Sequence, residues 1–219
     1  MNKNNIISIN NLYKSFSGQN VLRDINFNIQ SNEKLALIGS NGSGKTTLLK
    51  IISGILQPSS GTVFYDNINI HIPSSKKPSI GAAFNESMLD ERMTVMENLQ
   101  FYQSMISGDN DSTEISLLLK TFNIKNLNNV LIKNLSKGMK QRAVLIRALL
   151  NQENQSLLLL DEPSNNLDID AKEILLKNVL QNTKKTIIAA THDIQNINRW
   201  ATSVIELKNG RAILTNLKN

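Results

Sequence analysis

The sequence predicts an α/β fold with a mixed or parallel sheet core, an antiparallel β layer and an inserted α-helical subdomain. Three observations carry this prediction. The first third of the chain reads as β, the middle is richer in helical patterns, and the last third alternates helices with apolar strands. Alternation of helices and buried strands is typical of parallel strand pairing.

The individual elements follow from the spacing of apolar residues along the chain. Alternating or continuous apolar runs predict strands at residues 6–10, 21–29, 34–39, 61–70, 157–160, 186–191 and 204–207. A turn at KNGR, residues 208–211, and a last short strand follow. Helical periodicity predicts helices at residues 46–56, 94–106, 113–122, 134–150 and 171–180.

The helix expected at residues 134–150 is basic at its front and apolar at its back. Such helices are found at membrane surfaces, on nucleic acid or as solvated flanks. One stripe of this helix repeats at 4-3-4 spacing and is expected to pack in the core: Met139, Ala143, Ile146 and Leu150. The basic residues Lys137, Lys140 and Arg147 fall on another flank.

Length and composition predict one domain over residues 1–219, with the helical subdomain at approximately residues 85–135. The chain has no cysteine, which excludes disulfides and thiolate metal sites. No apolar run approaches the roughly 20 residues of a membrane-spanning helix, and the N-terminus lacks the apolar core of a signal peptide. We therefore expect a soluble, intracellular protein that is able to dock on a membrane partner.

The formal net charge of +6 leaves two explanations open. A basic balance favours nucleic acid or anionic lipid as a partner. Here the basic residues are scattered among many asparagines and isoleucines, which favours a solvated surface over a polyanion partner.

A glycine-rich loop, GSNGSGKT, lies between the strand at 34–39 and the helix that follows. It fits the pattern G-x-x-x-x-G-K-[S/T], in which backbone N–H groups and the helix N-terminus surround phosphate oxygens. Lys45 is placed to reach the β- and γ-phosphates, and the Thr46 hydroxyl to ligate Mg²⁺. The alternative is a glycine-rich turn without a ligand, which the flanking strand and helix disfavour. The expected phosphate-binding residues are Gly39, Ser40, Asn41, Gly42, Ser43, Gly44, Lys45, Thr46 and Thr47.

Two further strands of the predicted sheet end in polar residues. Asp161 and Glu162 end the apolar run LLLLDEP, and His192 follows the run TIIAAT. Ligands of parallel sheets bind beyond the carboxyl ends of the strands, so these side chains are expected beside the phosphate loop. Asp161 is placed to hold Mg²⁺, Glu162 to polarise a water, and His192 to contact the γ-phosphate or orient that water. Solvated turn residues, or a surface histidine, are the alternatives.

These motifs resemble those of the ATP-binding cassette (ABC) ATPase family, and the resemblance covers nearly the whole chain. GSNGSGKT resembles the Walker A motif, LLLLDEP the Walker B motif, and THD the switch-histidine segment. SNNLD resembles the D-loop, and LSKGMKQR resembles the signature motif that separates this family from other P-loop proteins. The resemblance implies an ABC-type P-loop cassette with ATP and Mg²⁺ as ligands.

The resemblance also assigns residues that the spacing alone does not. Phe16 takes the place of the aromatic residue that stacks on adenine, with a packed strand-end aromatic as the alternative. Asn85 stands where the family has the Q-loop glutamine, so its contact to Mg²⁺ or the attacking water is expected to be weaker. In the signature, Lys137 and Met139 replace the usual residues, whereas Ser136 and Gly138 are retained.

In this family two cassettes sandwich ATP, and the signature of one faces the Walker A loop of the other. The resemblance therefore implies an ATP-hydrolysing subunit of an ABC transporter, which forms a homodimer or heterodimer and docks on integral membrane subunits. Such a subunit would lie on the cytoplasmic face of a membrane. The signature variant KGMKQR resembles those of exporter-type cassettes and favours export as the direction of transport. No nucleic-acid partner is expected. Two alternatives remain open: a non-transport ABC ATPase acting on nucleic acid or ribosomes, and a weakly hydrolysing regulatory cassette.

Overall fold

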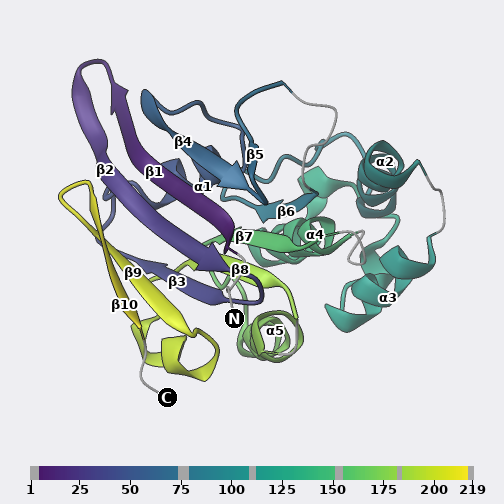
Figure 1. Ribbon diagram of the computed structural model, residues 1–219. Helices are drawn as coiled ribbons and strands as arrows, with labels where there is room; N and C mark the ends of the chain where they lie inside the picture. The colour runs from purple at the N-terminus through teal and green to yellow at the C-terminus, as the bar shows by residue number, and fades with distance from the viewer. Residues whose placement is uncertain (1–4, 74–78, 109–111, 151–154, 182–183, 217–219) are drawn as a thin grey trace.

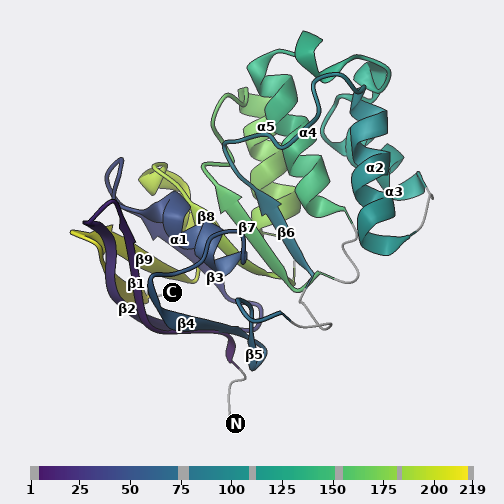
Figure 2. The same ribbon diagram turned by 90° about the horizontal axis from the view of Figure 1, so that it is seen from above.

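The computed structural model describes residues 5–73, 79–108, 112–150, 155–181 and 184–216 of the chain. Its described elements form layers around helix α1 (Lys45–Ile52). A small antiparallel sheet lies on one side of α1 and a larger sheet on the other, and the remaining helices cover the far face of the larger sheet (Figures 1 and 2). The architecture confirms the α/β fold that the sequence predicts.

The smaller sheet is antiparallel, with strand order β2-β1-β4-β5. Its strands are β1 (Asn5–Phe16), β2 (Gln19–Gln30), β4 (Ser60–Tyr65) and β5 (Ile68–Asn69). Register shifts interrupt the pairing of β1 with both of its neighbours. Phe16 is the last residue of this long strand.

The larger sheet has strand order β10-β9-β3-β8-β7-β6. Its strands are β3 (Lys34–Ile38), β6 (Ile80–Ala83), β7 (Leu157–Asp161), β8 (Thr186–Ala190), β9 (Ser203–Lys208) and β10 (Arg211–Asn216). All neighbours pair in parallel except β9 and β10. The carboxyl ends of β3, β8 and β7 therefore meet at one edge of the sheet.

Side chains of the central strands alternate between two hydrophobic clusters, because successive residues of a strand face opposite sides. Leu157 and Leu159 of β7 pack with α1 and the antiparallel sheet. Leu158 and Leu160 pack against the helices on the other face. Burial on both faces explains why this strand is a continuous apolar run in the sequence.

The remaining helical elements lie along the far face and the β6 edge of the larger sheet, with α2 and α3 farthest from β1 and β2 (Figures 1 and 2). They are α2 (Val95–Ser107), α3 (Thr113–Thr121), α4 (Lys137–Leu149), α5 (Ile169–Ile174) and its π-helical continuation η4 (Leu175–Gln181), together with the 3₁₀ turns η1 (Lys125–Leu127), η2 (Ile132–Asn134) and η5 (Ile194–Arg199). None of the helices in the described ranges has the length and apolar character that crossing a bilayer requires.

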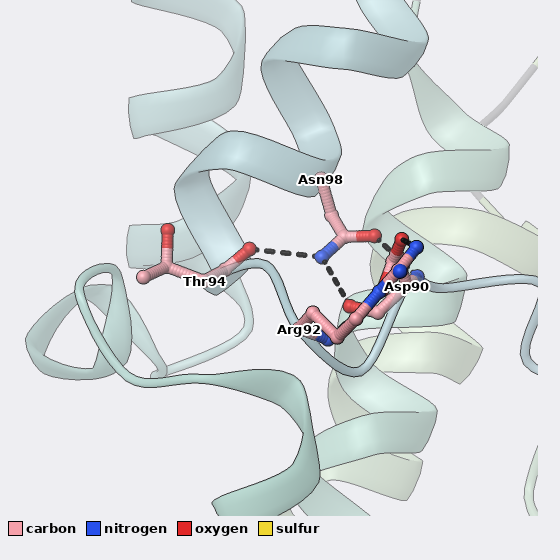
Figure 3. Close-up of polar contacts among 4 residues, drawn as sticks. All are labelled: Asp90, Arg92, Thr94 and Asn98. Atoms are coloured by element: carbon pink, nitrogen blue, oxygen red, sulfur yellow. Dashed lines mark hydrogen bonds and ion pairs between the residues drawn. The ribbon is translucent and has the colours of Figure 1, made fainter.

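The N-terminus of α2 is fixed by two sets of polar contacts. Thr94 and Glu97 form a capping box, in which each side chain accepts a hydrogen bond from the other residue's backbone N–H. The Asn98 side chain is buried; it accepts from the Asp90 N–H (2.8 Å) and donates to the carbonyls of Asp90 and Thr94, both at 3.0 Å (Figure 3). Helix α2 thus holds the turn that precedes it.

Several details of the predicted elements differ in the structure. Strand β1 runs to Phe16 instead of ending at residue 10, and α1 ends at Ile52 instead of residue 56. The run 61–70 is not one strand but a hairpin, because Asp66 and Asn67 take left-handed backbone conformations that turn the chain between β4 and β5. In α4, Met139 is 38% exposed rather than part of the core, whereas Ala143, Ile146 and Leu150 are buried as predicted. The third basic residue of the other flank, Arg147, is also buried.

Candidate functional site

Three loops meet at the carboxyl ends of β3, β7 and β8. The first is the glycine-rich loop, which begins directly after β3 and ends at the N-terminus of α1. The second carries Asp161 and Glu162 at the end of β7, and the third carries His192 after β8. The parallel order β3-β8-β7 therefore brings together the three segments that the sequence predicts as neighbours.

The glycine-rich loop is tightly packed at both ends. A Cβ on Gly39 would lie 2.6 Å from the Leu207 carbonyl oxygen, and Gly44, with a φ of 103°, caps α1 in a left-handed conformation. Lys45 folds back over the loop and donates to the Gly39 carbonyl at 2.9 Å. Its ammonium also donates to the Ser40 carbonyl at 3.2 Å. The loop thus gathers a cation and a helix N-terminus at one point, which suits an anionic ligand.

Asp161 and Thr46 form a direct contact between β7 and α1. The Thr46 hydroxyl donates to Asp161 Oδ2 at 2.7 Å. Asp161 is 1% exposed, and its Oδ1 is buried without a hydrogen-bond partner among the described residues. Burial raises the pKa of this carboxyl, against the opposing effects of the Thr46 hydrogen bond and of Lys45. A hydroxyl beside a buried carboxylate with an unused oxygen is a donor set that Mg²⁺ prefers.

Glu162 and His192 lie opposite each other across the ends of β7 and β8. His192 Nε2 is 3.0 Å from Glu162 Oε1, a distance typical of an ion pair, although the atoms lack hydrogen-bond geometry. The Glu162 N–H donates to the Ala190 carbonyl at 3.0 Å, which ties the two strand ends together. Burial is the main cause that raises the pKa of Glu162, and the charge of His192 opposes it. His192 Nε2 also lies 3.4 Å from Lys45 Nζ.

These groups line one open cavity of about 560 Å³, a size typical of ligand pockets. The residues around it are Phe16, Val21, Asn41, Gly42, Gly44, Lys45, Thr46, Thr47, Asn85, Asp161, Glu162, Asn165 and His192. Phe16 is 45% exposed, and Lys14 Nζ lies 4.8 Å from the centre of its ring. The exposed ring is available for stacking, as the resemblance implies.

The cavity also contains residues to which sequence reasoning gave no role. Val21 comes from β2 and Asn165 from the loop after β7. Asn165 belongs to the segment SNNLD, so the D-loop resemblance indicates the segment but not this residue. Gly39, Ser40 and Ser43 belong to the loop but do not line the cavity.

Ser136 and Gly138 lie elsewhere, in a second cavity of about 280 Å³ that shares no lining residue with the first. Ser136 caps α4, and its hydroxyl accepts from the Met139 N–H at 3.2 Å. A Cβ on Gly138 would lie 2.5 Å from the Asn166 carbonyl oxygen, so only glycine allows this approach of the loop to α4. The signature segment is therefore a separate site on the same chain.

Comparisons with known proteins agree with this geometry. The family model described as ABC transporter matches residues 22–165. The spermidine/putrescine import ATP-binding protein PotA of Clostridium novyi (strain NT) is 36% identical over 194 residues. That match covers 86% of this chain but only 55% of the relative, so the chain spans about half the length of that protein.

A second relative and a solved structure match over more of their length. The ABC transporter ATP-binding protein NatA of Bacillus subtilis (strain 168) is 32% identical, over 88% of this chain and 80% of that protein. The ATP-binding cassette MJ0796, a dimeric post-hydrolysis structure bound to ADP and Pi, superimposes with a TM-score of 0.86. It is 26% identical, and the match covers 97% of this chain and 99% of that one.

Proposed function

The chain belongs to the ABC transporter family, and from this premise we propose that it is an ATP-hydrolysing subunit that powers membrane transport. One observation carries the proposal. The cation of Lys45, the Thr46–Asp161 pair and the Glu162–His192 pair line a single cavity at the carboxyl edge of the parallel sheet. These are the groups that hold phosphates, a divalent cation and an attacking water.

In this proposal Lys45, together with the N–H groups of the glycine-rich loop, binds the phosphates of ATP, and Phe16 stacks on the adenine. Thr46, Asp161 and Asn85 are the residues that would hold Mg²⁺. The ion would neutralise charge on the β- and γ-phosphates. The fit rests on the buried, unused Oδ1 of Asp161 beside the Thr46 hydroxyl.

Glu162 is the group that we propose to accept the proton of the attacking water. Its buried carboxyl has a raised pKa, which makes it a better proton acceptor than an exposed glutamate. His192 lies at 3.0 Å from Glu162 Oε1, where it can hold the carboxylate in position and contact the γ-phosphate.

The separation of the two cavities supports the pairing with a second cassette that the family resemblance implies. Ser136 and Gly138 share no cavity with Lys45. As the resemblance implies, we propose that they bind the γ-phosphate of an ATP held by another subunit. We propose a homodimer or a heterodimer that docks on integral membrane subunits at the cytoplasmic face. Residues 85–135 would form the helical subdomain of each cassette. The expected exporter direction is not confirmed, because the relative whose name states a direction is an import protein.

The test is ATP turnover of the purified chain and of its Glu162→Gln variant. We expect the substitution to lower kcat by about 100-fold or more, because a positioned general base contributes roughly 10²–10⁴ in rate. Binding of ATP should persist, because Lys45 and the loop are unchanged. Glu206→Gln on β9 is the matched control, since that carboxylate is exposed and should leave turnover unaltered.

Other outcomes would favour the alternative functions. Negligible turnover of the wild type, unaffected by Glu162→Gln, would favour a regulatory cassette. Recovery of nucleic acid or ribosomes with the protein, in place of membrane subunits, would favour the non-transport class.

A further inference from the structure

Arg147 is a buried cation near the C-terminal end of α4. Its side chain donates to two backbone carbonyls, from Nη1 to Met88 at 3.1 Å and from Nη2 to Ala82 at 3.3 Å. Its Cζ lies 5.3 Å from the centre of the Tyr102 ring, and the residue is only 5% exposed. No carboxylate of the described residues lies within ion-pair distance of it.

Burying a guanidinium without a carboxylate costs free energy, because the charge loses its hydration. Burial lowers the pKa of Arg147, yet an arginine stays protonated in proteins. A leucine or methionine would fill the same space at lower cost. An apolar residue would lack the two guanidinium N–H donors of Arg147. The hydrogen bonds to the carbonyls of Met88 and Ala82 are therefore what the arginine adds at this position.

The two carbonyls lie on either side of Asn85, three residues before it and three after it. Phe84 is buried and anchors the segment, whereas Asn85 is exposed and lines the cavity that holds Lys45 and Glu162. Met88 takes a left-handed conformation, with a φ of 49°, which turns its carbonyl away from a regular strand. On the other flank, Lys50 of α1 pairs with Glu86 at 3.0 Å.

We propose that Arg147 is a positioning residue that clamps both ends of the segment 82–88 and thereby holds Asn85 at the nucleotide cavity. The clamp also joins this segment to α4, the helix that Ser136 caps at the signature. Only the role of Asn85 in turnover rests on the proposed function. The clamp itself is a property of the chain without nucleotide.

The first test measures the mobility of the segment without ATP. The chain contains no cysteine, so Glu86→Cys gives a single attachment point for a nitroxide spin label. In this background, Arg147→Met should shorten the rotational correlation time of the label at least twofold. Arg92→Met is the matched control. The Arg92 side chain is 90% exposed and, among the described residues, bonds only to Asp90.

The second test is kinetic and uses the unlabelled chain. Arg147→Met should lower kcat about tenfold while KM for ATP changes less than twofold, because Lys45 and Phe16 are untouched. The double variant Arg147→Met with Asn85→Ala should be no slower than Asn85→Ala alone, as expected of two residues that act through one contact.

Several results would overturn the clamp. An unchanged label mobility excludes it whatever the turnover, and multiplying losses in the double variant exclude action through Asn85. Full rescue by Arg147→Lys, which keeps the charge but has no fork, would assign the role to charge alone. If Arg147→Met does not fold, Arg147→Lys takes its place and is expected to show the mobile label. A wild type without turnover contradicts the proposed function but leaves the mobility test decisive.

Discussion

At the scale of single residues, Glu162 combines burial with an uncommon backbone. It is 7% exposed and has a φ of 51°, in the left-handed region that glutamate rarely adopts. Strained, buried carboxylates are unfavourable for folding and are found at functional sites. We therefore expect the residue that we propose as the base to destabilise the native state.

This cost predicts a dependence of stability on pH. The native pKa of Glu162 is raised above its usual value of 4.5, so the native state binds this proton more tightly than the unfolded state does. The free energy of unfolding accordingly decreases as the pH rises from 4.5 to the native pKa of Glu162. Above the native pKa this loss of stability is complete. Glu162→Gln removes the charge, so its Tm should exceed that of the wild type at pH 7.

The measurement is thermal unfolding of both proteins between pH 4 and pH 8. The advantage of Glu162→Gln should shrink as the pH falls, since both proteins are then neutral at this position. Glu206→Gln, which alters an exposed carboxylate, should follow the wild type throughout. A variant that is less stable than the wild type at pH 7 would show that the charge of Glu162 is net favourable.

The sequence predicts which residues lie together at the cavity, but its prediction for Met139 of α4 is wrong, and it does not predict the burial of Arg147. The phosphate loop, Asp161, Glu162 and His192 line or border one cavity because their motifs fix both residue type and strand end. Met139 and Arg147 are different, since periodicity gives the direction of a side chain but not where the core ends. The first turn of α4 extends beyond the core, and its last turns lie within it. Hence Met139 is exposed and Arg147 is buried.

At the scale of elements, the N-terminus of α2 depends on Asn98 (Figure 3). Asn98→Ala leaves the part-buried Asp90 N–H without its partner, whereas the carbonyls of Asp90 and Thr94 each keep one backbone donor. We therefore expect a loss of about 1–3 kcal/mol. Gln100→Ala on the same helix removes one exposed bond to Ser112 and should change stability by less than about 0.5 kcal/mol. Urea unfolding of both variants measures the difference. Equal losses would show that water replaces the Asn98 contacts.

Elements with strong periodicity were predictable, and those shaped by tertiary contacts were not. Strands β3, β7 and β8 are apolar runs, because both of their faces are buried. The pattern gave no strand at β6, whose residues Ile80–Ala83 include a glycine and two alanines, which have weak strand preference. A Cβ on Gly81 would lie 2.2 Å from the Ala148 carbonyl oxygen of α4, so close helix packing accounts for the glycine.

At the scale of the whole molecule, the patterns in the sequence do not predict the order of strands in the larger sheet. Strand β3 lies between β8 and β9, which come from the last third of the chain, and nothing local encodes that neighbourhood. The parallel alternation predicted only that the strand ends would share an edge. This arrangement places the phosphate loop and the signature in separate cavities.

That separation leads to a prediction about assembly. If Ser136 and Gly138 bind the γ-phosphate of an ATP held by a neighbouring subunit, that ATP forms part of the interface between the two subunits. Glu162→Gln should keep its ATP and shift from monomer to dimer when ATP is added, as measured by size-exclusion chromatography with light scattering. Adding Ser136→Arg should abolish the dimer but spare ATP binding, because Ser136 does not line the cavity of Lys45. Lys177→Arg on η4 is a conservative exposed control that should leave the dimer intact. A protein that binds ATP yet stays monomeric contradicts the homodimer and requires a different cassette as its partner.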